Sequence, residues 1–268
     1  MNINYDTFRG KLFVQFIRRY FRDTSSIIAL DVGCRYGAFL VEMAKSFKKV
    51  IGIDIDEGAL EIIKKKIEKF DNVIIKKESI LKTDFPDNFF DLITLEGVLE
   101  WVGLGDPSIS PKECQIQALY ECKRILKPNG ILYCGIENKL FPAYWFRDPH
   151  SHLPLTVILP RRLAQYYYER KTKTGFKYYG QNILSYWGYA KMFSKVFGSC
   201  DIKIPLPNYK YLYYISSLNS KELMKKAKKT LSIKNLRKTY KATTLAVLAL
   251  SLLGLKYFAN NFVILCKK

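Results

Sequence analysis

Two short stretches of the chain combine glycines with carboxylates in a pattern that suits nucleoside binding. The first is Leu30-Asp31-Val32-Gly33-Cys34-Arg35-Tyr36-Gly37, and a later apolar run ends at Asp54. A glycine-containing turn between a strand and a helix lets a ligand approach the backbone and presents amide N–H groups at the helix N-terminus. A carboxylate at the end of the next strand can accept both hydroxyl groups of a ribose. The two stretches therefore predict a nucleoside-binding crevice.

The turn does not have the spacing of a dinucleotide site. When Gly33 is taken as the first glycine of the G-x-G-x-x-G fingerprint, Arg35 and Ala38 stand at the second and third glycine positions. A pyrophosphate needs close backbone approach at the second position, and a long arginine side chain works against it. A nucleoside cofactor without phosphate needs less room, so the turn favours that class of ligand.

Four segments resemble, in order, the motifs of class I S-adenosylmethionine-dependent methyltransferases, in particular the type 11-like proteins. DVGCRYG at 31–37 resembles motif I, with Arg35 in place of its middle glycine, and IGIDID at 51–56 resembles motif II. FPDNFFDLITLEGVLEWV at 85–102 resembles the stretch around the fourth strand, and LYECKRILKPNGILYCGIE at 119–137 resembles the late R-x-L-K-P-G-G-x-L motif. The resemblance implies S-adenosylmethionine as the cofactor and methyl transfer as the reaction.

The same resemblance implies which residues hold the cofactor. The turn would line its methionine end, the carboxylate of Asp54 would hold the ribose, and Ile55 would pack on the adenine. Ser79 stands where the family often has an acid near the adenine amino group. The full set of expected cofactor-binding residues is Asp31, Gly33, Cys34, Gly37, Asp54, Ile55, Ser79, Ile80 and Glu96.

The acceptor side contains a second group of residues that could act in catalysis. Methyl transfer from a sulfonium is an in-line displacement that depends on proximity and alignment, and an oxygen acceptor also gains from a general base. We expect His150 or His152 to be that base, with Asp148 as its orienter and Glu137 as the alternative base. The Asp-x-His-x-His spacing lacks a further ligand in the sequence, so no metal is expected. Glu100 and Trp101 are interpreted as structural.

Beyond residue 136 the chain resembles one subset of these methyltransferases, which is associated with the biosynthesis of surface polysaccharide and lipid-linked glycan. The resemblance rests on the sequence around Glu137-Asn138-Lys139, the Asp148–His152 segment, LPRR at 159–162 and the helix that begins at Tyr186. It implies that the methyl acceptor is a hydroxyl group of a glycan or a lipid-linked saccharide. Tyr166–Tyr168, Tyr178 and Tyr179 are candidates for stacking on sugar rings.

Alternating apolar runs and helical patterns predict how these residues are positioned. Continuous apolar strands between helices indicate a parallel sheet that is covered on both faces. We expect an α/β Rossmann-like fold with a mostly parallel seven-stranded sheet, helices on both faces and a basic, aromatic-rich C-terminal elaboration. The expected strands are 27–31, 50–54, 73–76, 90–95, 131–136, 202–206 and 262–266. Residues 1–138 form the cofactor-binding core, 139–200 an acceptor-side insertion, and 201–268 the last strands with a basic and apolar helical insertion.

The charge of the chain is confined to one half. The formal net charge is +20; residues 1–138 carry 20 Lys and Arg against 20 Asp and Glu, whereas residues 139–268 carry 24 against 4. A basic half attracts phosphate, so an anionic acceptor or carrier is the expected partner. Contact of the basic and apolar C-terminal helices with a membrane surface is the associated expectation, since the apolar run 242–255 is shorter than a bilayer span.

Two other functions fit the same sequence. An RNA methyltransferase would explain the basic half, but no N/D-P-P-Y/F motif follows the fourth strand, which makes nucleic acid the weaker alternative. A cofactor-binding or membrane-docking module without catalysis is the other alternative. The start of the chain has no apolar signal-like run, so we expect six reduced cysteines and a cytoplasmic protein, peripheral at the inner face of the membrane.

Overall fold

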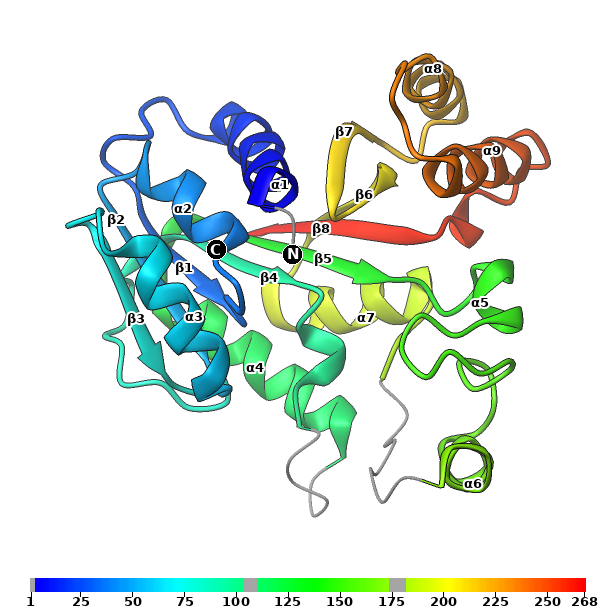
Figure 1. The fold of residues 1–268 in the computed structure, drawn as a ribbon, viewed down its shortest axis with the longest axis horizontal. Helices are drawn as coiled ribbons and strands as arrows, with labels where there is room; N and C mark the ends of the chain where they lie inside the picture. Colours follow the sequence, from blue (N-terminus) through cyan, green and yellow to red (C-terminus); the bar gives the residue numbers. More distant parts are fainter. Residues whose placement is uncertain (1–2, 104–109, 174–181) are drawn as a thin grey trace.

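The computed structural model describes residues 3–103, 110–173 and 182–268, which form an eight-stranded sheet with helices on both faces (Figure 1). The strand order is β3-β2-β1-β4-β5-β8-β6-β7. The strands are β1 (Ile28–Val32), β2 (Lys49–Asp54), β3 (Val73–Lys77), β4 (Phe90–Glu96), β5 (Leu126–Glu137), β6 (Cys200–Asn208), β7 (Tyr211–Ser216) and β8 (Asn261–Lys267). The first five run parallel, and β8 is antiparallel to both β5 and β6.

The prediction of seven strands was one short. The additional strand is β7, which pairs antiparallel with β6 at the end of the sheet. The turn between β6 and β7 brings Tyr209 back under the sheet edge, where its side chain is 2% exposed. The β6–β7 hairpin therefore extends the sheet by one strand and also places the buried Tyr209 side chain against the sheet edge.

Helices cover both faces of the sheet. One face packs on α1 (Ile3–Ile17), α2 (Ala38–Ala44) and α3 (Glu57–Ile67), and the opposite face packs on α4 (Pro111–Ile125) and α7 (Tyr186–Phe197) (Figure 1). The local sequence fixes several helix starts. Asp56 caps α3 by accepting from the Ala59 N–H at 3.2 Å, and Ser110 and Glu113 form a capping box around Pro111 at the start of α4. Both devices set the angle at which the chain leaves the sheet edge.

Two further groups of helices lie at the β8–β6 end. α5 (Pro142–Phe146) and α6 (Arg161–Thr172) follow β5, and α8 (Ser220–Leu231) and α9 (Lys238–Leu252) pack on each other beside β6 and β7 (Figure 1). Short 3-10 turns are η1 (Arg18–Tyr20), η2 (Leu99–Trp101) and η3 (Lys256–Phe258). Within the described ranges, none of the helices is at once long enough and apolar enough to cross a bilayer.

One expectation about the cysteines was wrong. Cys200 and Cys266 form a disulfide, whereas Cys34, Cys114, Cys122 and Cys134 are buried and lie outside it. Cys200 and Cys266 lie directly opposite each other on antiparallel β6 and β8, with their Cα atoms 4.5 Å apart. That separation is typical of a non-hydrogen-bonded antiparallel pair and lies within the range that a disulfide can bridge. The sequence could not show this pairing, because it depends on the register of two strands far apart in the chain.

Candidate functional site

The turn after β1 meets the end of β2 directly. The backbone N–H of Arg35 donates a 2.8 Å hydrogen bond to Oδ2 of Asp54, and the N–H of Asp56 donates to Oδ1 at 3.0 Å. The N–H groups of Gly33 and Cys34 both donate to the carbonyl of Ile53, at 2.8 and 3.2 Å. The glycine turn and the Asp54 carboxylate, which the sequence predicts to share one crevice, are thus in hydrogen-bonding contact.

The backbone of this turn occupies the left-handed region of conformational space. Gly33 has φ +66°, and a Cβ at this position would lie 2.5 Å from Cγ2 of Val98, so no other residue fits without displacement. Arg35, which replaces the middle glycine of the motif, adopts φ 44°. The backbone of Arg35 therefore adopts the left-handed conformation that glycine usually provides at this position. The guanidinium of Arg35 lies 5.5 Å from the centroid of the Tyr36 ring.

Asp31 lies at the floor of the turn and is hydrogen-bonded to the neighbouring strand. The hydroxyl of Thr94 on β4 donates to its Oδ1 at 2.6 Å, and the residue is 5% exposed. Burial, with a smaller contribution from the nearby Glu96 carboxyl, raises the pKa of Asp31 to about 7. A buried carboxyl with this pKa can ionise readily when a cation is placed next to it.

Glu96 ends β4 at the same edge, and one of its two carboxylate oxygens is engaged by α1. Oε2 forms an ion pair with the guanidinium of Arg9 on α1, and that guanidinium also lies 5.9 Å from the centroid of the Phe39 ring. This ion pair therefore holds α1 against the end of β4, near the β1 turn. Glu96 was expected to contact the cofactor. The structure places it at the predicted edge of the sheet, where it is the acidic partner of this ion pair.

The remaining residues expected to contact the cofactor differ in how they are placed. Ile55 is 73% exposed next to Asp54, which leaves its side chain available to a ligand. Ser79 lies in the segment after β3, where its backbone forms a bridge with Lys82. The side chains of Cys34 and Ile80 are each 5% exposed and pack in the core. Gly37 has φ +73° at the N-terminus of α2. Contacts to a ligand from Cys34 and Ile80 can therefore come only from their backbone.

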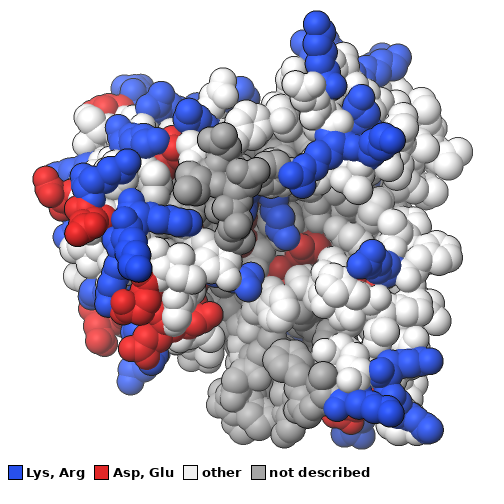
Figure 2. Space-filling view, viewed as in Figure 1, with Lys and Arg blue, Asp and Glu red and all other residues white. Residues whose placement is uncertain are grey.

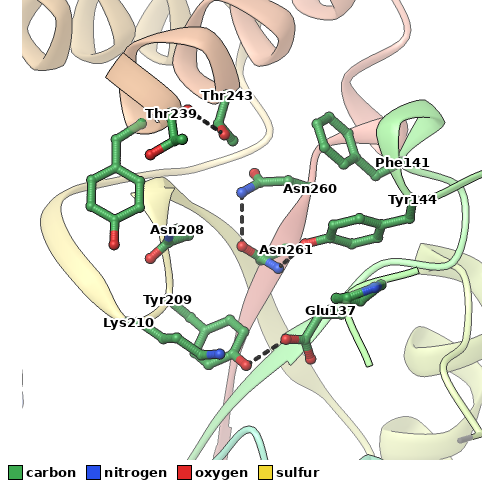
Figure 3. Close-up of a pocket in the computed structure, with 12 residues that line it drawn as sticks. Glu137, Phe141, Tyr144, Asn208, Tyr209, Lys210, Thr239, Thr243, Asn260 and Asn261 are labelled. Atoms are coloured by element: carbon green, nitrogen blue, oxygen red, sulfur yellow. Dashed lines mark hydrogen bonds between the residues drawn. The ribbon is translucent and has the colours of Figure 1, made fainter. Parts of the chain in front are cut away.

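A cavity of about 190 Å³ opens at the same sheet edge, beyond β4 (Figure 3). It is walled by the end of β5, α5, the β6–β7 turn, α9 and the start of β8. Most of the lining groups are hydroxyls, amides or aromatic rings, and the lining residues are Glu137, Phe141, Tyr144, Pro149, Asn208, Tyr209, Lys210, Thr239, Tyr240, Thr243, Asn260 and Asn261. The cavity is smaller than the roughly 300–1,000 Å³ that drug-sized ligands occupy, so it fits one polar ring or group of a larger molecule.

Hydrogen bonds hold the cavity walls in place (Figure 3). The hydroxyl of Tyr209 donates to Oε1 of Glu137 at 2.6 Å, and a Cβ on Gly97, just after β4, would lie 2.7 Å from the same hydroxyl oxygen. Asn260 donates to Oδ1 of Asn261 at 2.7 Å, and Asn261 donates to the hydroxyl of Tyr144 at 3.1 Å. Tyr209 therefore joins the cavity to the end of β4, next to the predicted cofactor crevice.

The two histidines are in different environments. The Nε2 atom of His150 lies 3.9 Å from Oε2 of Glu137, and the His150 side chain is 10% exposed. The carboxylate of Asp148 accepts from the backbone N–H groups of His150 and Ser151, at 2.7 and 3.0 Å, so it orders the loop backbone and not the imidazole. His152 is exposed and has φ 59°. The structure therefore brings His150 and Glu137 together and leaves His152 apart.

Glu100, which was interpreted as structural, lies next to this pair. The ligand atoms of Glu100, Glu137 and His150 all lie within 4.8 Å of one another. Burial and the adjacent Glu137 carboxyl raise the pKa of Glu100 well above its usual range. Burial by itself would raise the pKa of Glu137. The side chains around it have the opposite effect, with His150 contributing most, and together they lower this pKa. The two carboxyls can therefore share one proton, which Glu100 holds.

His150 completes the electrostatics of this cluster. Burial is the largest influence on the imidazole and lowers its pKa, against the opposing effect of Glu137. His150 is therefore neutral near pH 7, and hydrogen bonds such as that from Tyr209 stabilise the charge on Glu137. We refer to Glu100, Glu137 and His150 as the acidic cluster.

Sequence reasoning missed Glu100, Tyr209 and the Asn260–Asn261 pair. They come from η2, the β6–β7 turn and the start of β8, and only the sheet order brings them to one place. Tyr178 and Tyr179, which were expected to stack on sugar, lie outside the described residues.

Comparison with known proteins finds similarity in the first half of the chain. Residues 30–134 match the family model described as a methyltransferase domain. An uncharacterized methyltransferase of Schizosaccharomyces pombe is 35% identical over 147 residues, which cover 51% of this chain and 48% of the relative. The chain spans about half the length of the curated relatives that it matches, with 56% and 48% of two of them covered.

Solved structures share the fold over almost the whole chain. The 4+2 cyclase SpnF superposes with a TM-score of 0.54 at 16% identity, covering 97% of this chain and 80% of the cyclase. Phosphoethanolamine N-methyltransferase 2 of Haemonchus contortus, in complex with phosphomonomethylethanolamine and S-adenosylhomocysteine, gives 0.54 at 13% identity, covering 95% of this chain and 52% of that chain. These likenesses confirm the expected Rossmann-like α/β fold.

Proposed function

We propose that this chain is an S-adenosylmethionine-dependent methyltransferase whose acceptor is a hydroxyl group of a glycan or a lipid-linked saccharide. The observation that carries the cofactor assignment is the contact between the β1 turn and Asp54, which brings a glycine turn and a strand-end carboxylate together at the carboxyl end of β1 and β2. The methyltransferase domain match over 30–134 supports the same cofactor, and a structure with this fold holds S-adenosylhomocysteine.

The fold by itself does not determine the reaction, because the same architecture carries a cyclase. Methyl transfer is supported by the position of the cavity, two strands from the β1 turn along a continuous sheet edge. In the reaction, the acceptor oxygen attacks the methyl carbon of the sulfonium. An O–C bond forms, the C–S bond breaks, the oxygen loses its proton, and the cofactor leaves as a neutral thioether.

The cavity lining supports a hydroxyl acceptor. Amides and hydroxyls of Asn208, Asn261 and Thr243, next to aromatic rings, can exchange hydrogen bonds with sugar hydroxyls, and Lys210 adds one positive charge. The acidic cluster borders this cavity through Glu137 and is the group that removes the proton from the acceptor oxygen. Of the two expected histidine bases, we assign this role to His150 together with Glu137, since His150 lies next to Glu137 and is buried, whereas His152 is exposed.

The test uses radiolabelled cofactor. The protein is incubated with S-adenosyl-[methyl-³H]methionine and an organic-solvent extract of lipid-linked saccharides, before and after mild acid hydrolysis of the glycosyl linkage. We expect label in the saccharide released by acid. Label that appears only in RNA added at physiological salt would replace this proposal with the RNA alternative. Cofactor binding without transfer to any of these acceptors would favour the non-catalytic alternative.

We further propose that the C-terminal helices rest on an anionic membrane surface. Figure 2 shows Lys and Arg side chains over the part where α8 and α9 lie, with no acidic side chain beside them on this face. The end of α9 and the segment after it expose Leu252, Leu253 and Leu255, at 66%, 73% and 43%. Helices that carry both basic side chains and exposed leucines are suited to a membrane surface. Because α9 also lines the cavity through Thr239, Tyr240 and Thr243, a lipid-anchored acceptor could reach it from the bilayer.

Vesicle sedimentation tests the membrane contact. The protein should sediment with phosphatidylglycerol–phosphatidylcholine vesicles and not with pure phosphatidylcholine. The double change Leu252→Ser and Leu253→Ser should abolish the sedimentation, whereas Ile62→Ser, at a residue of α3 that is 49% exposed, should leave it intact. Equal binding of all three proteins, or binding of none, would contradict this contact without touching the cofactor assignment.

A further inference from the structure

The acidic cluster contains more unsatisfied polar atoms than a closed protein interior normally tolerates. Both carboxylate oxygens of Glu100, Oε2 of Glu137 and Nε2 of His150 are buried without a hydrogen-bond partner. Glu100 and Glu137 are 1% and 3% exposed. Buried polar atoms are nearly always paired in native proteins, because an unpaired one is costly to desolvate. In the part of the chain that the structure describes, a proton shared between Glu100 and Glu137 would pair one oxygen of each residue, which still leaves the other oxygen of Glu100 and Nε2 of His150 without a partner.

We propose that Glu100, Glu137 and His150 bind a divalent transition-metal ion, of the Zn²⁺, Co²⁺ or Mn²⁺ class, at the edge of the acceptor cavity. Two carboxylates and one imidazole form a mixed oxygen and nitrogen ligand set, which these ions accept and which Mg²⁺ and Ca²⁺ favour less. The two carboxylate charges would balance the two charges of the ion. Because the inference specifies how the acceptor is handled, its catalytic meaning rests on the proposed methyltransferase function.

The geometry is close to that of a bound site. Ligands about 2.1 Å from a tetrahedral ion lie roughly 3.4 Å from one another. Nε2 of His150 and Oε2 of Glu137 are 3.9 Å apart, and all three ligand atoms lie within 4.8 Å, so contraction by side-chain rotation suffices. The ligands are also held in orientation: Tyr209 donates to the other oxygen of Glu137, and Asp148 fixes the backbone of His150.

One of the three ligands, Glu137, also lines the acceptor cavity, whereas Glu100 and His150 do not. Three protein ligands leave one position of a tetrahedral ion vacant, and an acceptor hydroxyl that reaches the ion past Glu137 would take that position. With an ion bound, the acidic cluster would act on the acceptor proton through that ion and not as a free base: the ion would supply Lewis acidity, and the proton would be lost to water. The sequence predicted no metal because its only histidine motif, around Asp148, lacked a further ligand. The fold supplies that ligand set from η2, β5 and the loop after α5 instead.

Metal binding can be measured directly, without cofactor or acceptor. Tag-free protein, stripped with chelator, is titrated with Co²⁺ by absorption spectroscopy and with Zn²⁺ by calorimetry. We expect one ion per chain, with a visible Co²⁺ spectrum. His150→Ala and Glu100→Gln should each weaken binding at least tenfold. His152→Ala, which changes the other of the two histidines in the chain, should bind as the unaltered protein does.

Several results would overturn the inference: no Co²⁺ spectrum at millimolar metal, unchanged affinity in His150→Ala, or an equal loss in His152→Ala. The absence of any metal would mean that a shared proton alone satisfies the acidic cluster. If Glu100→Gln does not fold, the two histidine variants still decide the outcome. Calorimetry with S-adenosylmethionine on the same proteins separates the two proposals. Cofactor binding without metal refutes only this inference, and metal without cofactor refutes the proposed function.

Discussion

The hydroxyl of Tyr209 donates a 2.6 Å hydrogen bond to Oε1 of Glu137, two residues that are 72 positions apart in the chain. This contact ties the β6–β7 turn to the end of β5 and leaves only Oε2 of Glu137 facing Glu100 and His150. It therefore sets the orientation of the carboxylate on which the acceptor chemistry depends.

Removing that hydroxyl should impair turnover more than binding. In Tyr209→Phe, a buried carboxylate oxygen loses its donor, at a cost of about 1.5–3 kcal/mol for a charged acceptor, or about 10–100-fold. We expect kcat to fall by this factor while the Kd for S-adenosylmethionine stays within twofold. Tyr133→Phe is the matched control, because the buried Tyr133 hydroxyl has no hydrogen-bond partner. An equal fall in kcat in both variants would point to general destabilisation.

Asp54 should govern cofactor affinity. Asp54→Asn keeps the size of the side chain but replaces a charged acceptor of hydrogen bonds with a neutral amide. We expect S-adenosylmethionine to bind about 10–100-fold more weakly, measured by calorimetry. Asp56→Asn lies two residues away and preserves the cap on α3, since asparagine is an equally good cap, so its affinity should be normal. Normal affinity in Asp54→Asn would refute the ribose assignment.

The raised pKa of Asp31 makes stability depend on pH. The folded protein keeps the Asp31 proton up to pH about 7, whereas in the unfolded chain the pKa of this carboxyl is the ordinary aspartate value of 3.8. The folded state thus binds more protons between these pH values, so the contribution of Asp31 to the free energy of unfolding is present in acid and lost as the pH rises to about 7. At ~1.4 kcal/mol per unit, roughly 4 kcal/mol is the upper limit.

Urea unfolding at pH 5 and pH 8 measures this effect. Between pH 5 and pH 8, the free energy of unfolding of the unaltered protein should fall further than that of Asp31→Asn. The difference should be on the order of 2–4 kcal/mol. Cofactor binding at pH 6 should also release protons, because the cationic methionine end favours ionised Asp31. Identical pH slopes in the two proteins would show that the pKa of this carboxyl is not raised.

Gly33 should tolerate no side chain. Gly33→Ala adds a Cβ 2.5 Å from Val98 at φ +66°, so both backbone strain and a clash arise, at a cost of ~2–4 kcal/mol. Gly254→Ala shares the left-handed backbone, at φ +75°, but its Cβ would meet nothing within 4 Å, so strain of ~1 kcal/mol is expected. Denaturant unfolding of the two variants isolates the clash, and a smaller loss in Gly33→Ala than in Gly254→Ala would refute it.

The cofactor side could be predicted from sequence because its residues are local. Residues 31–37 form one turn. β2 lies parallel to β1, so Asp54 at the end of β2 reaches this turn, as the alternation of strands and helices implies. Apolar runs likewise indicated seven of the eight strands. β7 (Tyr211–Ser216) was missed because its buried residues come in pairs, separated by a pair of half-buried residues, and do not alternate one by one.

The acceptor side could not be predicted, because contacts across the sheet build it. Glu100 belongs to a motif that looked structural, and its partner Glu137 lies on another strand end. Tyr209 was unassigned between two expected elements, and its role depends on the hairpin that returns it beneath Gly97. The periodicity of apolar residues within one segment does not show which strands lie side by side. These contacts follow only from the order of the strands in the sheet.

Cys200 and Cys266 close a covalent ring that contains α8, α9 and the turn bearing Tyr209. A protease that cuts the chain between α8 and α9 would therefore leave its two fragments attached to each other. They would part on a denaturing gel only after a thiol reductant is added, and a nicked molecule would retain every wall of the cavity.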